Sequence, residues 1–155
     1  MIDTAAPNKD EDVDRFANEY PNNPTDDKDT IVGRIYDTPT DGIFQVYWPN
    51  DNLRYEWYYK NGKRADGVSK SWWPNGNLKA KHTLKDGEYD ELYTTWYSNG
   101  QKDKEKTFKD GIKVGLWTHW YPNGQKKEER TYRDGEYDGL RTYWDENGKK
   151  KEEVT

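Results

Sequence analysis

The chain has 155 residues, a formal net charge of −5 at pH 7, 35% charged residues and no cysteine. This length allows one domain with a tail, and the absence of cysteine excludes disulfides and thiolate metal sites. Leu, Ile, Val and Phe together number 20, which is typical of a disordered chain. The 8 Trp and 13 Tyr residues reverse that conclusion, because their large rings provide a core.

The negative charge is concentrated at the N-terminus. Residues 1–30 contain nine acidic and three basic residues, whereas residues 31–155 contain 21 acidic and 22 basic ones. We therefore divide the chain into an acidic arm, residues 1–30, and a repeat domain, residues 31–155. The balanced charge of the repeat domain argues against a nucleic-acid partner. No signal-like or bilayer-spanning apolar run is present, so we expect no membrane contact and a location in the cytoplasm or in an assembled particle.

The arm contains one segment, residues 10–20, with the pattern of a short amphipathic helix. The residues on its apolar stripe are Val13, Phe16, Ala17 and Tyr20. Pro21 ends the pattern, and residues 21–29, which are polar, rich in Asn and Asp and interrupted by proline, are typical of a flexible linker. A helix of this length is marginal alone, so we predict that Phe16 and Tyr20 dock onto the repeat domain or onto a partner chain. The alternative is a disordered tail.

From residue 42 onward the sequence repeats with a period of about 24 residues. The units begin at Gly42, Gly67, Glu91, Gly115 and Gly139. Five residues into each unit stands a large aromatic residue: Tyr47, Trp72, Trp96, Trp120 or Trp144. An Asn-containing turn follows, such as Pro122-Asn123-Gly124, and a second turn comes ten residues later, such as Asp134-Gly135. A fixed period in this range indicates a repeat architecture.

Each unit predicts one β-hairpin. Leu116, Thr118 and Trp120 alternate as in a strand, the turn reverses the chain, and the polar run 126–132 returns. Successive hairpins predict an all-β fold. We expect an elongated single-layer antiparallel meander of nine or ten strands, with no helix after residue 40.

The register of each hairpin decides which side chains share a face. Pairing Trp120 with Lys126 and continuing without interruption puts Trp120, Leu116 and Tyr132 on one face, with Trp117 on the other. The equivalent sets are Trp96, Leu92 and Phe108, and Trp72, Val68 and Leu84. These recurrent residues are therefore predicted to be the ones that the architecture needs.

The pattern G-L-x-T-x-W-Y-P-N-G-Q-x-K-x-E-x-T-Y-x-D-G resembles the MORN-repeat variant found in bacterial proteins labelled YwqK-type antitoxins. The resemblance covers residues 42–155 and is clearest over residues 96–148. Asp51 departs from it at a turn Gly and Glu91 at a repeat-initial Gly. The resemblance implies an elongated, twisted antiparallel sheet that binds other proteins and has no catalysis of its own.

The sequence shows no asymmetric set of residues suited to catalysis. The carboxylates that recur at one strand position are Glu56, Glu105, Glu129 and Glu153. Such repetition favours solvated cross-strand pairs, because acid–base catalysis needs two groups in different environments. His82 and His119 are far apart in the sequence and have no cysteine near them, which favours structural or surface roles. We predict no catalytic residue, no metal and no cofactor.

Positions that vary between units are candidates for recognition. Two and four residues past each repeat start, the residue type changes while Trp and Gly recur, and aromatic residues with a polar edge are common at interaction hot spots. The candidate protein-binding residues on the sheet are Phe44, Tyr93, Trp117, His119 and Tyr143. The alternative is that these side chains only pack against their neighbours.

Together these features predict a non-enzymatic module for protein–protein interaction or assembly, antitoxin-like, a scaffold or a structural component, of bacterial or phage origin. Its partner is expected to be another protein or copies of itself. The alternative is a carbohydrate- or choline-binding module. Residues 57–67 resemble the aromatic repeats of cell-wall choline-binding modules, whose rings enclose a quaternary ammonium.

Overall fold

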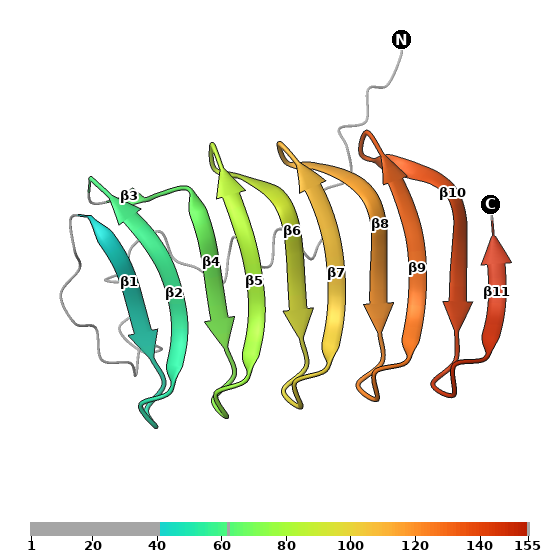
Figure 1. Cartoon of the computed structure of the whole chain (residues 1–155), viewed down its shortest axis with the longest axis horizontal. Coiled ribbons are helices and arrows are strands. Elements are labelled where there is room, and N and C mark those ends of the chain that lie inside the picture. The colour runs from blue at the N-terminus through green and yellow to red at the C-terminus, as the bar shows by residue number, and fades with distance from the viewer. Residues whose placement is uncertain (1–40, 62, 155) are drawn as a thin grey trace, which may run out of the picture. The chain divides into compact units, whose positions relative to one another are not determined.

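The computed structural model describes residues 41–61 and 63–154, which form one open antiparallel sheet without a helix. The strands are β1 (Gly42–Tyr47), β2 (Leu53–Lys60), β3 (Lys63–Arg64), β4 (Gly67–Trp72), β5 (Leu78–Lys85), β6 (Glu88–Trp96), β7 (Lys102–Lys109), β8 (Ile112–Trp120), β9 (Lys126–Arg133), β10 (Glu136–Trp144) and β11 (Lys150–Val154). They pair in chain order, except that β3 pairs only with β2 (Figure 1). The predicted all-β meander is confirmed, with eleven strands instead of nine or ten.

The additional strand, β3, arises in the one irregular unit. The unit that ends before Gly67 is one residue longer than the others, and its strand after the second turn is divided into β3 and β4. β3 pairs with the end of β2, as residues 88–89 of β6 pair with the end of β5. β4 pairs with β2 at two positions, Tyr55 with Ser71 and Glu56 with Lys70. The pairing of β2 is therefore interrupted between Glu56 and Tyr59.

Asparagine side chains connect each Asn-containing turn to the next unit. Their Nδ2 atoms each donate to a backbone carbonyl of the following turn at 2.7 Å. The donors are Asn50, Asn75, Asn99 and Asn123, and the acceptors are Pro74, Ser98, Pro122 and Glu146. The turns end in residues with positive φ, such as Gly124 at 85°, which glycine adopts without steric cost. The repeated turn residues thus both reverse the chain and join neighbouring hairpins.

The predicted register is correct at the turn and wrong beyond it. Trp120 pairs with Lys126 as predicted, but a β-bulge next to this pair shifts the rest of the return strand. A shift of one residue moves every following side chain to the opposite face, so Tyr132 lies with Trp117 instead of Trp120. Bulges recur at the equivalent Trp of the two preceding hairpins. The predicted placements of Leu84 and Phe108 on the face of the recurrent Trp are wrong for the same reason.

We name the side of the sheet that carries Trp117 the aromatic face. The Phe, Tyr and Trp rings that contact one another on this face belong to Phe44, Tyr55, Trp57, Tyr59, Tyr89, Tyr93, Phe108, Trp117, Tyr132 and Tyr137. The centroid of the Trp117 ring lies 5.2 Å from Phe108 and 4.4 Å from Tyr132. The Lys106 ammonium lies 4.8 Å from the Trp117 ring and the Arg130 guanidinium 5.8 Å from it. Rings and the alkyl stems of basic residues together form the core of this face.

The opposite side, which carries Trp120, is named the stripe face. The aliphatic residue directly after each repeat start lies here, and these residues are between 45% and 58% exposed. They are Ile43, Val68, Leu92, Leu116 and Leu140. Within the first four hairpins their cross-strand partners are Tyr58, Thr83, Thr107 and Thr131, which are uncharged. We name the five aliphatic residues the aliphatic stripe.

The predictions for the arm concern residues that the structure does not describe. The domain boundary at residue 30, the helix over residues 10–20 and the contact residues Phe16 and Tyr20 all lie outside the described ranges. They stay predictions.

Candidate interaction surface

Three of the five candidate binding residues on the sheet are buried in the core. Phe44, Tyr93 and Trp117 are 1%, 8% and 0% exposed. Trp117 also donates its indole N–H to the backbone carbonyl of Thr107 at 3.1 Å, which satisfies its one polar group. These side chains serve as packing residues of the aromatic face, and a role in partner binding stays a prediction for them.

The other two candidates, His119 and Tyr143, surround the buried Glu128. The carboxylate of Glu128 accepts a hydrogen bond from Nε of Arg141 at 2.6 Å and lies 3.5 Å from Nδ1 of His119. The guanidinium of Arg141 lies 4.7 Å from the Tyr143 ring. Burial lowers the pKa of His119 to about 4, although Glu128 acts in the opposite direction. At pH 7 the imidazole is therefore neutral, and the group forms a half-buried polar network.

His82 lies in a second part of the aromatic face. Its ring stacks on Tyr93 at 5.9 Å and meets the edge of Tyr89 at 5.2 Å. Burial, and secondarily the charge of Arg64, lower the pKa of His82 to about 3. This environment favours a neutral histidine packed between rings, which agrees with the structural role predicted for it.

Sequence reasoning missed the aliphatic stripe as an exposed surface. It placed Val68, Leu92 and Leu116 among the residues that the architecture needs because they recur, yet each is about half exposed. The available signal was the recurrence of one aliphatic residue directly after each repeat start. Contiguous apolar surface of this kind marks interaction sites more often than isolated exposed residues do.

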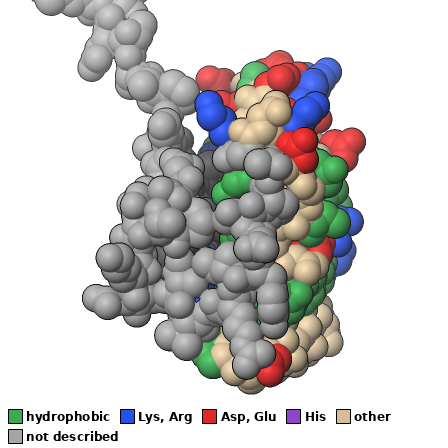
Figure 2. All heavy atoms as spheres, turned by 90° about the vertical axis from the view of Figure 1, so that its left-hand side faces the viewer, with side chains coloured by type: hydrophobic (Ala, Val, Ile, Leu, Met, Phe, Trp, Pro, Cys, Tyr) green, Lys and Arg blue, Asp and Glu red, His purple; other side chains and the backbone are tan. Residues whose placement is uncertain are grey.

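The charged groups beside the stripe are paired within the sheet. Three of the recurring glutamates form ion pairs with the lysine three residues before them: Lys102–Glu105, Lys126–Glu129 and Lys150–Glu153. Seen from the β1 end, acidic and basic side chains are interspersed on the described surface (Figure 2). The recurring carboxylates thus occupy equivalent, paired positions, so the stripe is bordered by locally neutral surface.

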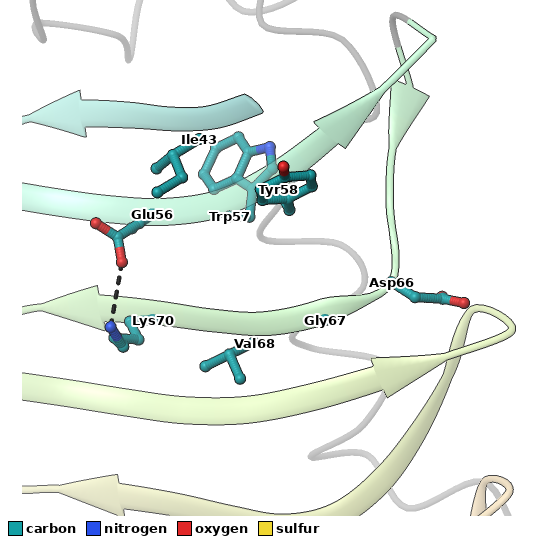
Figure 3. A pocket seen from close by; sticks show the side chains of 8 residues that line it. All are labelled: Ile43, Glu56, Trp57, Tyr58, Asp66, Gly67, Val68 and Lys70. Atoms are coloured by element: carbon teal, nitrogen blue, oxygen red, sulfur yellow. Dashed lines mark hydrogen bonds and ion pairs between the residues drawn. The ribbon is translucent and has the colours of Figure 1, made fainter. Parts of the chain in front are cut away.

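A pocket of about 430 Å³ lies where the sheet opens between β2 and β4 (Figure 3). Its apolar lining residues are Ile43, Trp57, Tyr58 and Val68, and its charged residues are Glu56, Asp66 and Lys70. Two of the apolar residues, Ile43 and Val68, belong to the aliphatic stripe. The pocket is therefore continuous with the stripe.

Two aromatic residues of the choline-like segment, Trp57 and Tyr58, line this pocket (Figure 3). The rings of Trp57 and Tyr59 pack against Phe44, with centroids 4.8 and 5.4 Å away, on the aromatic face. Tyr58 lies on the stripe face and is 47% exposed. The rings of the segment are therefore divided between the two faces of the sheet, whereas a quaternary-ammonium cage needs several rings around one cavity.

Residues 41–61 and 63–154 contain no group of three or more His, Asp and Glu side chains arranged to hold a metal ion. The same part of the chain has no helix long and apolar enough to cross a membrane.

An open sheet of hairpins that recur about every 24 residues defines a β-hairpin repeat protein. The family model described as MORN repeat variant matches the chain five times, at residues 40–63, 65–86, 92–110, 113–134 and 137–155. The chain belongs to this MORN-repeat family. Repeats of the family are in general modules for interaction with proteins or membranes, and they are generally non-enzymatic. No curated protein matches the chain.

Proposed function

We propose that this chain is a non-enzymatic module for protein–protein interaction and that the aliphatic stripe is its contact surface. The observation that carries the proposal is the half-exposed row of Ile43, Val68, Leu92, Leu116 and Leu140. Removing such surface from water contributes a favourable transfer free energy of roughly 25 cal/mol for each Å² of apolar area, which offsets the costs of association. The general role of the family supports the same function.

The partner in this proposal is another protein or a second copy of the chain. A toxin protein, which the antitoxin resemblance implies, is one form of the first class. Neither nucleic acid nor membrane is included, because residues 31–155 balance 22 basic against 21 acidic residues. A location in the cytoplasm or in an assembled particle stays a prediction.

The absence of enzymatic activity is part of the proposal. The support is that Glu105 and Glu129 occupy equivalent, lysine-paired positions, whereas catalysis needs groups with divergent pKa values at one place. The two histidines, His82 and His119, are packed on the aromatic face with lowered pKa values. These features suit structural roles.

The test is capture from a native extract with matched variants of the full chain. Leu92→Lys/Leu116→Lys places two charges on the stripe, and Gln101→Lys/Gln125→Lys places two charges on exposed turn positions. We expect the stripe variant to lose bound partner at least tenfold and the turn variant to bind as the unmodified chain does. Equal capture by both variants would show that the stripe is not the contact surface. Sedimentation of the chain alone then separates a second copy from a different protein.

A further inference from the structure

We propose that the pocket between β2 and β4 is a socket for one uncharged apolar side chain, aromatic or branched aliphatic, of a partner protein. This inference rests on the proposed function and names the chemistry that anchors the partner. It would make the β2–β4 end of the stripe the point where the partner is fixed in position.

The socket lies in the one unit that has an extra residue. β3 pairs with the end of β2 as the first residues of β6 pair with β5, and Ala65 donates its N–H to the carbonyl of Tyr58 at 2.8 Å, so the pairing of β2 is interrupted only between Glu56 and this contact. What distinguishes the place is Tyr58 on the stripe face, where the next three hairpins carry Thr83, Thr107 and Thr131. The array thus provides a pocket with an aromatic wall at one defined place, which allows a partner to bind in one register.

The charged residues of the socket already satisfy one another. One carboxylate oxygen of Glu56 accepts a hydrogen bond from Lys70 at 3.2 Å, and the other accepts one from Gln45 at 2.8 Å. The two oxygens of Asp66 accept the backbone N–H groups of Asp86 and Gly87 at 2.7 and 3.0 Å. These bonds lower the pKa of Asp66, which keeps it ionised and bound to the next turn.

This pairing decides between ligand classes. Each carboxylate oxygen in the socket already accepts one hydrogen bond, and the Lys70 ammonium beside Glu56 disfavours a cationic ligand there. What remains open is the apolar wall of Ile43, Tyr58 and Val68, which are 58%, 47% and 45% exposed. An uncharged side chain gains burial there without having to break an ion pair, and interface anchors are commonly aromatic residues seated in such pockets. Tyr58 offers one ring for stacking.

The probe for this proposal is N-acetyl-L-tryptophanamide, with N-acetyl-L-leucinamide as the aliphatic counterpart. Both are titrated into the ¹⁵N-labelled full chain, and amide chemical shifts are followed. We expect saturable shifts confined to residues around Ile43, Tyr58 and Val68, with a Kd on the order of 1 mM for such a small ligand in an open site. Choline and methyl glucoside are titrated in parallel and are expected to leave these amides unchanged.

Three variants, two in the pocket wall and one control, test whether the result is specific. Val68→Lys puts a charge into the wall and should abolish the shifts, whereas Leu140→Lys makes the equivalent change at the other end of the stripe and should preserve them. Ile43→Ser provides a second wall variant that adds no charge and should weaken binding at least threefold. Shifts that persist in Val68→Lys and Ile43→Ser would overturn the socket, as would a response to choline or methyl glucoside in place of the amides.

The two proposals fail separately. Partner capture that depends on Leu92 and Leu116, without any response to the amides, would keep the interaction surface and remove the socket. If the amides bind at the socket but capture does not depend on the stripe, the socket remains an apolar site. The proposed function, and with it the protein partner of the socket, would then be wrong.

Discussion

The two faces of the sheet use the same strands for opposite purposes. On β8, Trp117 is fully buried on the aromatic face, whereas its neighbour Leu116 is 54% exposed on the stripe face. On β9, Glu128 is buried in a network with Arg141, whereas Glu129 forms a pair with the partly exposed Lys126. The comparison shows that the sheet formed by the described strands builds its core on one face, from rings and basic side chains. The other face then keeps its aliphatic residues available for contact.

The largest expected difference between the faces concerns neighbouring residues of β8. Trp117→Ala should lower the free energy of unfolding by about 3–5 kcal/mol, because it removes a fully buried ring. Leu116→Ala should cost less than about 1 kcal/mol, because half of that side chain is already exposed. Urea titration followed by tryptophan fluorescence and circular dichroism measures both. Similar losses in the two variants would contradict the assignment of the core to the aromatic face.

The fold could be predicted from the sequence because the turns carry specific chemistry at a fixed period. Gly124 and its equivalents need positive φ, and the Asp-Gly and Asn-Gly pairs mark the second turns, so hairpins follow directly. The register beyond the bulge could not be predicted. Residues 126–131 of the return strand are polar, so no apolar alternation fixes which side chains face the core.

The burial of the candidate residues could not be predicted for the same reason. Recurrence of Leu116 and Trp120 suggested the core and variation at Trp117 suggested an exposed surface, whereas Leu116 is 54% exposed and Trp117 is fully buried. A role of Trp117 in partner binding stays a prediction. The pocket is lined by residues of β1, β2 and β4 beside the longer unit, and a one-residue difference in spacing does not reveal a cavity.

The two glutamates of β9 give a second, smaller contrast. Glu128→Gln removes the charge that accepts a 2.6 Å hydrogen bond from Arg141 in a buried setting, and it should cost about 1–3 kcal/mol. Glu129→Gln affects a partly exposed ion pair and should change stability by less than about 0.5 kcal/mol. Thermal and urea unfolding of both variants at pH 7 measures the difference. If Glu129→Gln were the more damaging substitution, the buried network would not be a part of the core.

Acidification should act on the aromatic face through its histidines. The pKa of His82 in the folded chain, about 3, lies below its ordinary value of 6.5. Between these values the unfolded chain binds a proton that the folded chain does not, so the stabilising contribution is complete above pH 6.5 and is lost as the pH falls toward 3. His82 should therefore lower the free energy of unfolding by up to about 1.4 kcal/mol for each unit by which the pH falls between 6.5 and 3.

The control for this pH dependence is His82→Gln, which removes the titrating group. Urea midpoints measured from pH 7 to pH 5 should fall less steeply for the variant than for the unmodified chain. The pH dependence that remains in the variant is then attributed to His119, whose pKa is also lowered. Parallel pH profiles for the two chains would mean that His82 is accessible to protons in the folded state.

The most direct test of the division between the faces uses the absence of cysteine from the chain. Leu116→Cys and Ser71→Cys each introduce a single thiol, the first at a position 54% exposed on the stripe face and the second at a position 1% exposed on the aromatic face. The rates of reaction with a thiol reagent under native conditions are compared with the rates in urea. We predict that the thiol at position 116 reacts nearly as fast in the folded chain as in the unfolded one, and that the thiol at position 71 is protected at least 100-fold, as local opening limits access to buried groups. Equal native rates at the two positions, or protection at position 116, would contradict the account.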